Sequence, residues 1–169
     1  MYAASDIARW FLAKNNQKRI ENEQDNYEVY DGITHLKLQK LLYFAQGIHL
    51  ALYKTPLFSN DILAWEHGPV VQDVYDIYKP VGRNPISYER EECDVPVLNA
   101  IECDEHAKTA LELTYDNFSI YTAWQLREMT HTVGAPWDTI VKSQGKNAVI
   151  PTTLIQNYFE KEVVDDAED

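Results

Sequence analysis

The sequence predicts a mainly α-helical fold, a single-domain bundle of about six or seven helices with room for one small β-hairpin. Apolar residues recur at a spacing near 3.6 in several segments, and residues that start or stop helices flank those segments. The chain has 169 residues, enough for one hydrophobic core. We therefore expect one domain over residues 1–164, with a polar insertion loop at 15–33 and an acidic disordered tail at 165–169.

The first two helices are predicted from apolar stripes that a polar stretch separates. Residues 2–14 carry one stripe, whereas residues 15–32 are polar and lack periodicity, which indicates an exposed loop. The stripe in residues 35–53 is the clearest in the chain and predicts a helix with one buried face. Thr34 can cap the first free N–H groups of this helix, and Pro56 lies just beyond its end.

A short extended segment and a turn are expected after the second helix. Residues 57–65 are interpreted as extended, and Gly68 followed by Pro69 is a chain-reversal signal. Pro69 also suits the first turn of a third helix, because proline lacks the N–H that a helix start leaves unpaired. The apolar stripe from Val70 to Tyr78 supports that third helix.

The second half of the chain predicts further helices after an irregular stretch. Residues 95–98 are interpreted as a brief strand that pairs with residues 62–65. Asp104 can cap a helix that ends near Phe118. The remaining helices are expected to begin at Ser119 or Thr122, at Trp137 and at Thr152.

The charge of the chain favours a protein as its partner. A net charge of −12 and a pI near 4.7 argue against binding to duplex DNA or to an anionic membrane, because both need clustered Lys and Arg. We expect no nucleic-acid partner and no membrane association. No apolar run could span a bilayer and no secretory signal is evident, so we expect the chain in the cytoplasm.

The sequence contains no pattern that predicts catalysis. The five histidines lack metal-ligand spacing, and His49 lies on an apolar stripe as a core imidazole would. Cys93 and Cys103 are far apart and are expected to be free thiols. No nucleophile elbow or phosphate-binding loop is present. We therefore predict no enzyme, no catalytic residue, no metal and no cofactor.

Three segments carry a resemblance to a known family. KLQKLLYFAQG at Lys37–Gly47, AWEHGPVVQDVY at Ala64–Tyr75 and THTVGAPWD at Thr130–Asp138 resemble the Panacea antitoxin domain family, and AASDIARWFL near the start and LIQNYF near the end also fit. The resemblance implies a helical antitoxin that neutralises a cognate toxin protein by direct contact. In that family a member can also deliver its toxin to the ClpXP protease, so a Clp protease is a second implied partner. The resemblance implies no catalytic residues.

The turn after the second helix is the place where we expect a partner to bind. Tyr and Trp bury a large area with few rotatable bonds, which makes them frequent interface anchors. The turn can equally be a packing joint between helices. We predict a partner-binding surface made of Lys37, Lys40, Trp65, His67, Gly68 and Pro69. A metal-dependent hydrolase and a prophage-encoded DNA-binding regulator are the alternative functions.

Overall fold

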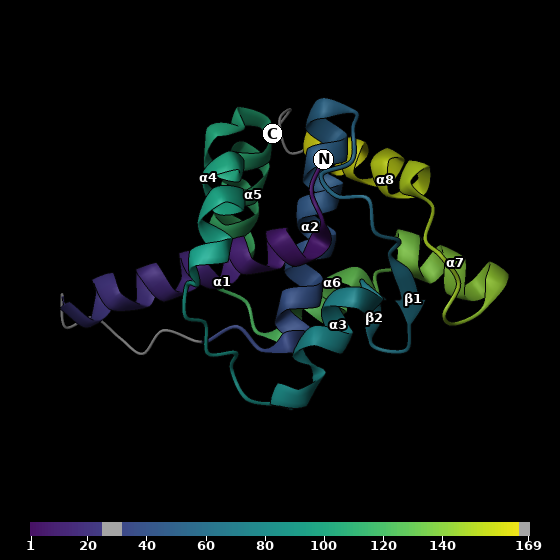
Figure 1. Cartoon of the computed structure of the whole chain (residues 1–169). Helices are drawn as coiled ribbons and strands as arrows, with labels where there is room; N and C mark the ends of the chain where they lie inside the picture. Colours follow the sequence, from purple (N-terminus) through teal and green to yellow (C-terminus); the bar gives the residue numbers. More distant parts are fainter. Residues whose placement is uncertain (25–31, 166–169) are drawn as a thin grey trace.

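The computed structural model describes residues 1–24 and 32–165, and it confirms a mainly helical protein with one small hairpin (Figure 1). The described residues contain eight α-helices, more than the sequence predicted. The helices are α1 (Ala4–Gln24), α2 (His35–Tyr53), α3 (Gln72–Tyr78), α4 (Val95–Cys103), α5 (Glu105–Phe118), α6 (Ala123–Thr130), α7 (Pro136–Gln144) and α8 (Thr152–Asp165). The strands are β1 (Leu63–Trp65) and β2 (Gly68–Val70), and short 3-10 turns cover Lys79–Val81 and Glu92–Asp94.

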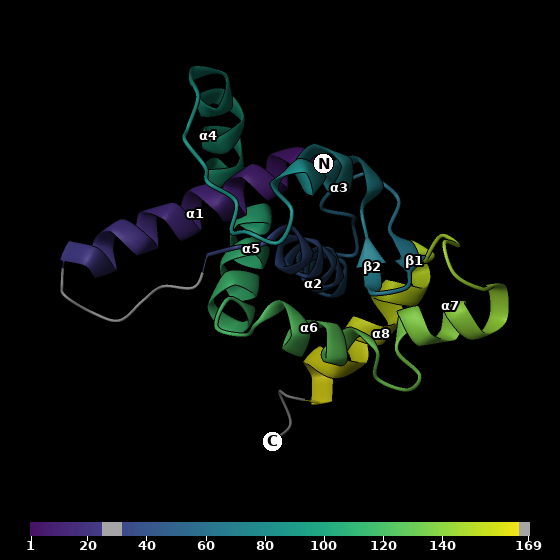
Figure 2. The same ribbon diagram turned by 90° about the horizontal axis from the view of Figure 1, so that it is seen from below.

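Helix α2 is the centre of the molecule. Figure 2 shows α2 nearly end-on, with α3, α5, α6, α8 and the hairpin arranged around it. Fourteen of its residues are buried, so the predicted single buried face is wrong: the helix is covered on nearly all sides. Its predicted ends are confirmed. The Thr34 hydroxyl accepts a hydrogen bond from the Lys37 N–H at 3.3 Å, and Lys54 ends the helix in a left-handed conformation with φ 61°.

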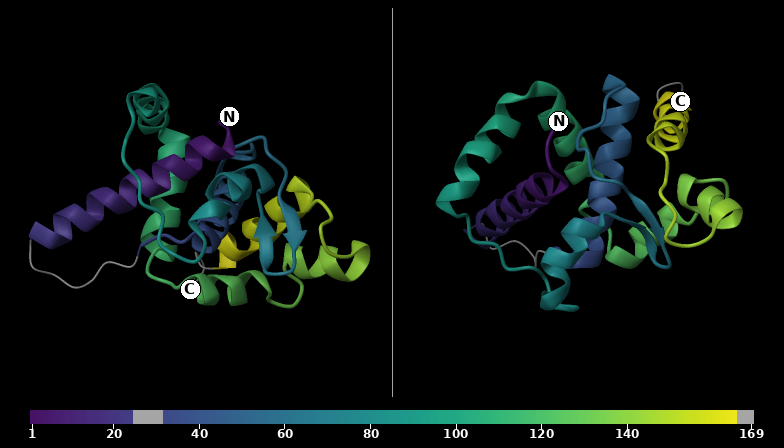
Figure 3. Two further views of the ribbon diagram at one scale, coloured as in Figure 1. Left: turned by 60° about the horizontal axis from the view of Figure 1, so that its bottom comes forward. Right: turned by 45° about the vertical axis from the view of Figure 1, so that its right-hand side comes forward.

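Helix α1 is longer than the sequence predicted. The loop expected at residues 15–33 is wrong for residues 15–24, which continue the helix; residues 25–31 lie outside the described residues. Asn15 is buried, and its side-chain oxygen accepts a 3.1 Å hydrogen bond from the Tyr115 hydroxyl, which offsets the cost of burying the amide. Further along, Lys18 and Glu21 pair at 3.0 Å on one helix face. Helix α1 and α7 extend from opposite sides of the molecule (Figure 3).

The acidic tail predicted at residues 165–169 falls mostly outside the described residues. Asp165 is the last residue of α8, and residues 166–169 lie beyond that part of the chain. No helix among the described residues has both the length and the apolar character that a membrane span needs.

The strand predicted at residues 95–98 is wrong, because these residues open helix α4. Pro96 occupies the first turn of that helix, where its missing N–H costs nothing, and Leu98 and Ile101 face the core. Strand β1 was expected to pair with residues 95–98. It instead pairs antiparallel with β2 and forms a single bridge from Leu63 to Val149.

The hairpin corrects the prediction that Pro69 starts a helix. Trp65 pairs with Gly68, so Glu66 and His67 form a two-residue turn, and Pro69 lies within β2. A proline is tolerated there because β2 has only one neighbouring strand and needs no donor on its free side. Helix α3 then begins at Gln72, after an extended residue at Val71.

A buried glutamine on α2 fixes the chain where the hairpin passes into α3. The Val71 N–H donates to Gln39 Oε1 at 2.7 Å, and Gln39 Nε2 donates to the Val71 carbonyl at 3.3 Å. Replacing Gln39 with leucine leaves the Val71 N–H buried and unpaired, whereas the Val71 carbonyl keeps its 3.0 Å hydrogen bond from the Tyr75 N–H. We expect Gln39→Leu to lower the free energy of unfolding by about 1–3 kcal/mol in urea titrations. The exposed Gln144→Leu variant serves as the control and should change it little; equal effects would contradict this account.

Candidate partner-binding site

Two segments that are distant in the sequence pack together beside β1. The indole Nε1 of Trp137 donates a hydrogen bond to the Trp65 carbonyl oxygen at 2.7 Å, a contact that spans 72 residues. The imidazole of His131 lies against the Trp137 ring, with 3.7 Å between ring centroids. The hairpin and the start of α7 are therefore held in a fixed relation by one indole.

Lys40 lies beneath the hairpin and supports it. Its ammonium group donates to the Pro69 carbonyl oxygen at 3.1 Å, and its side chain is 1% exposed. Burial, reinforced by the nearby Arg127 charge, lowers the pKa of Lys40 to about 7. We call the Trp65–Pro69 turn together with Lys40, His131 and Trp137 the hairpin joint.

Gly68 allows the close approach of the hairpin to Lys40. A Cβ atom at this position would lie 2.7 Å from Lys40 Nζ and 3.0 Å from Thr130 Oγ1. The φ of Gly68 is +106°, a backbone conformation that residues with a side chain rarely adopt. Both the space and the backbone therefore require glycine here.

The six residues predicted to bind a partner occupy different depths. Lys40, Gly68 and Pro69 meet in the joint and are buried, whereas Lys37 turns away and donates to the Ser119 carbonyl oxygen at 2.6 Å. Trp65 is half-buried against Tyr75, and His67 at the tip is exposed. Buried lysines cannot contact a partner on this surface, so the prediction of partner binding depends on Trp65 and His67.

Comparison with known proteins identifies the family. The profile described as "Antitoxin SocA-like, Panacea domain" matches residues 38–138, which include the hairpin and the segment that packs against it. The chain belongs to the SocA-like Panacea domain family. Antitoxin SocA of Caulobacter vibrioides (strain NA1000 / CB15N) is 31% identical to it over 119 residues, which are 68% of this chain and 63% of that relative. The chain thus spans less than two thirds of the relative's length. No solved structure matches it.

The Panacea domain residues that complete the joint were not singled out from the sequence. Trp137 and His131 lie in the THTVGAPWD segment, whose resemblance to the family was the one available signal. His131 Nδ1 lies 2.7 Å from the Arg127 carbonyl oxygen and donates to it, which orients the ring toward Trp137. Burial lowers the pKa of His131, which favours the neutral form of its ring.

The tip of the hairpin is tied to the loop after α7. The exposed carboxylate of Glu66 lies 3.2 Å from Lys146 Nζ, and this hydrogen-bonded pairing lowers the pKa of Glu66. Solvent screens such an exposed pair, so its contribution to stability is small. The neighbouring His67 is the other residue of the turn, and its side chain is exposed to solvent.

The other groups considered from the sequence lie outside the hairpin joint. His49 is the core imidazole that the sequence predicted: it is buried, and its Nδ1 lies 2.6 Å from the Thr55 carbonyl oxygen. Cys93 and Cys103 are exposed free thiols, as predicted. Within residues 1–24 and 32–165, no three His, Cys, Asp or Glu side chains lie close enough to hold a metal ion.

Proposed function

We propose that this Panacea domain is an antitoxin that neutralises a cognate toxin in the cytoplasm by binding it directly, without catalysing a reaction. The observation that carries the proposal is that the family match includes both segments of the hairpin joint, which fold against each other into one rigid unit. The net charge of −12 favours fast association with a basic or mixed-charge toxin.

The exposed part of the hairpin joint is the first surface to test for toxin contact. Trp65 is half-buried, and the contact of its ring with Tyr75, 4.8 Å between centroids, restricts the orientation of the indole, while Trp137 holds its carbonyl oxygen. His67 projects from the turn beside it. An aromatic ring that is ordered before binding loses little conformational entropy in a complex, which is characteristic of interface hot spots.

We expect the double variant Trp65→Ala, His67→Ala to bind the toxin at least tenfold more weakly and to lose growth rescue. The protein to test as the toxin is the product of the gene adjacent to this chain's gene, once its expression alone is shown to inhibit growth. Affinity is measured by calorimetry and rescue by co-expression, with circular dichroism to verify the fold. Trp124→Ala is the matched control, since Trp124 is a 65% exposed tryptophan on α6, outside the hairpin. Full rescue by a folded double variant would exclude the hairpin as the contact surface.

Delivery of the bound toxin to the ClpXP protease is a finer form of the same proposal. Masking alone should leave the half-life of the toxin unchanged or longer when the antitoxin is present. Delivery should shorten it, and deletion of the protease should restore it. Pulse-chase measurements of the toxin in the two hosts therefore separate the two modes.

A further inference from the structure

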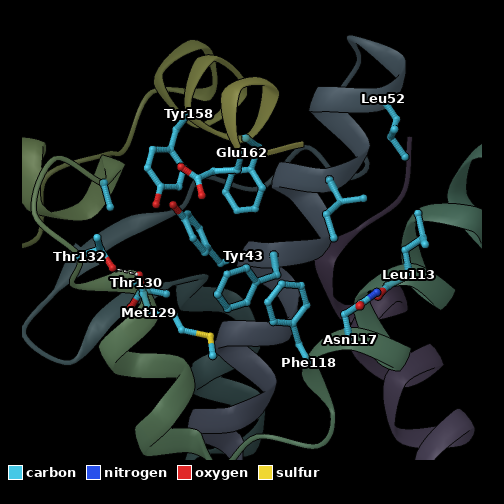
Figure 4. A pocket seen from close by; sticks show the side chains of 14 residues that line it. Tyr43, Leu52, Leu113, Asn117, Phe118, Met129, Thr130, Thr132, Tyr158 and Glu162 are labelled. Atoms are coloured by element: carbon cyan, nitrogen blue, oxygen red, sulfur yellow. Dashed lines mark hydrogen bonds between the residues drawn. The ribbon is translucent and has the colours of Figure 1, made fainter. Parts of the chain in front are cut away.

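An apolar groove lies on the face of the molecule between α2, α5, α6 and α8. It has a volume of about 550 Å³, and Phe44, Phe118 and Phe159 form much of its wall. Leu52 on α2 and Leu113 on α5 lie at its edge and are 38% and 41% exposed. Figure 4 shows these side chains around an open space between the helices. Apolar side chains that remain this exposed favour a partner that covers them.

A buried hydroxyl in this groove has no hydrogen-bond partner. Tyr43 is 2% exposed, and its hydroxyl oxygen is completely enclosed yet bonds to no group among the described residues. The ring projects from α2 into the groove, with the hydroxyl directed toward Tyr158 of α8 (Figure 4). Burial raises the pKa of Tyr43 well above its usual range, so the hydroxyl keeps its proton and can donate it. An unpaired buried donor is costly, and an occupant that displaces the side chains enclosing this hydroxyl and brings an acceptor would remove that cost.

The charge around the groove indicates the chemistry of the occupant. Among the side chains that the structure describes, Glu162 of α8 is the only charged one that lines the groove, and it is exposed. The described lining includes no lysine or arginine, and the whole chain carries a net charge of −12. A second copy of the same acidic chain would bring like charges together, whereas a basic partner is attracted.

We propose that the apolar groove binds an amphipathic helix of the toxin, with apolar side chains inserted among the phenylalanines, a basic residue near Glu162 and an acceptor for the Tyr43 hydroxyl. Helices dock in apolar grooves of this kind through anchors spaced three or four residues apart. This inference rests on the proposed function, because it assumes that the partner is the toxin. It adds a second contact surface to the hairpin joint. The two are adjacent, since Thr130 lines the groove and also lies beneath Gly68.

The first test replaces residues at the groove edge by glutamate in the full chain. The probe is the toxin encoded beside this chain, titrated by calorimetry and co-expressed for growth rescue. We expect Leu52→Glu and Leu113→Glu to weaken binding at least tenfold. Ile77→Glu is the matched control, because Ile77 is a 53% exposed aliphatic residue on α3 outside the groove, and it should bind as wild type does.

The second test separates binding from folding. Tyr43→Phe removes only the hydroxyl, and in the free protein that hydroxyl is buried without a partner. We expect this variant to have an unchanged or higher melting temperature and to bind the toxin about threefold to tenfold more weakly. A purely structural role of Tyr43 would not produce stronger folding together with weaker binding.

The outcomes distinguish this inference from the proposed function. Growth rescue by the wild type, together with loss of toxin binding in the groove variants, supports both the groove as a contact surface and the proposed function. Wild-type rescue with full binding by both glutamate variants overturns the groove and leaves the proposed function standing, whereas no binding by the wild type overturns both. Self-association that Leu113→Glu abolishes, or an apolar small molecule that co-purifies and is lost in that variant, would assign the groove to another occupant and also overturns the inference.

Discussion

Replacing Gly47 with alanine is expected to lower the free energy of unfolding by about 1–3 kcal/mol. An alanine in the middle of a helix normally stabilises it by roughly 1 kcal/mol relative to glycine. In α2, however, a Cβ at Gly47 would lie 2.4–2.5 Å from three carbon atoms of the Phe159 ring on α8. Real Cβ atoms do not approach carbon so closely, so one helix must move.

Aromatic neighbours on α2 restrict the ring of Phe159, although one side of the ring borders the apolar groove. Phe159 is 6% exposed and meets Tyr43 edge to face at a centroid separation of 5.5 Å and Phe44 at 6.1 Å. A displaced ring would disturb these aromatic contacts, and α8 would have to shift away from α2 instead. Gly47 therefore sets the distance between these two helices and the width of the apolar groove.

Urea denaturation of Gly47→Ala, Phe159→Leu and the double variant measures this effect. Phe159→Leu removes the edge of the ring that meets the added methyl group, so the double variant should lose less stability than the two single losses summed. A Gly47→Ala protein that is more stable than wild type, as helix propensity alone predicts, would disprove the clash.

The parts of the fold that depend on neighbouring residues were predictable from the sequence. Thr34, Asp104 and Thr122 each precede a helix, and each side chain accepts a hydrogen bond from a backbone N–H in the first turn. The mainly helical class followed from the same local reasoning, whereas the hairpin was expected between other segments, because residues 95–98 form a helix and β1 pairs with β2. The extension of α1 did not follow from local reasoning either, because the hydrogen-bond partner of the buried Asn15, Tyr115, is 100 residues away in the sequence.

The candidate site was predictable only in part, for the same physical reason. The resemblance directed attention to the hairpin turn, and Trp65 and His67 do reach the surface there. Nothing local indicates that Lys40 is buried, because a lysine next to an apolar stripe ordinarily reaches solvent along its long side chain. The hairpin closes over α2 and removes that route, and the joining indole of Trp137 comes from a segment 72 residues away from its partner.

Burial of Lys40 should make the stability of the protein rise with pH above neutrality. The pKa of Lys40 is lowered from 10.5 to about 7 in the folded protein, first by burial and second by the charge of Arg127. Between these two values the unfolded chain binds a proton that the folded chain does not, so raising the pH favours folding. We expect a slope of up to about 1.4 kcal/mol per pH unit. Below pH 7 both the folded and the unfolded chain bind the proton. The destabilisation caused by burying the charged Lys40 is then at its maximum and does not change with pH.

Other titrating groups leave a clear interval for this measurement. Burial lowers the pKa values of His35, His49 and His131, so they add a slope only below about 6.5. The Cys93 thiol, whose pKa is raised from 9.0 by its hydrogen bond to Glu91, affects the curve above that value. Unfolding in urea between pH 7 and 9 therefore reports chiefly on Lys40.

Lys40→Met tests this assignment directly. Methionine fills a similar volume without a proton to bind, so the variant should lose the slope between pH 7 and 9. At pH 7 it should be more stable than wild type by about 2–4 kcal/mol, less than the full electrostatic term because the Pro69 carbonyl loses its donor. Lys161→Met, an exposed lysine on α8, is the control and should keep the wild-type slope. Parallel curves for wild type and Lys40→Met would show that Lys40 keeps an ordinary pKa. Lys40 would then be charged although it is buried beneath the hairpin. Its contacts there do not replace the water that normally solvates an ammonium group.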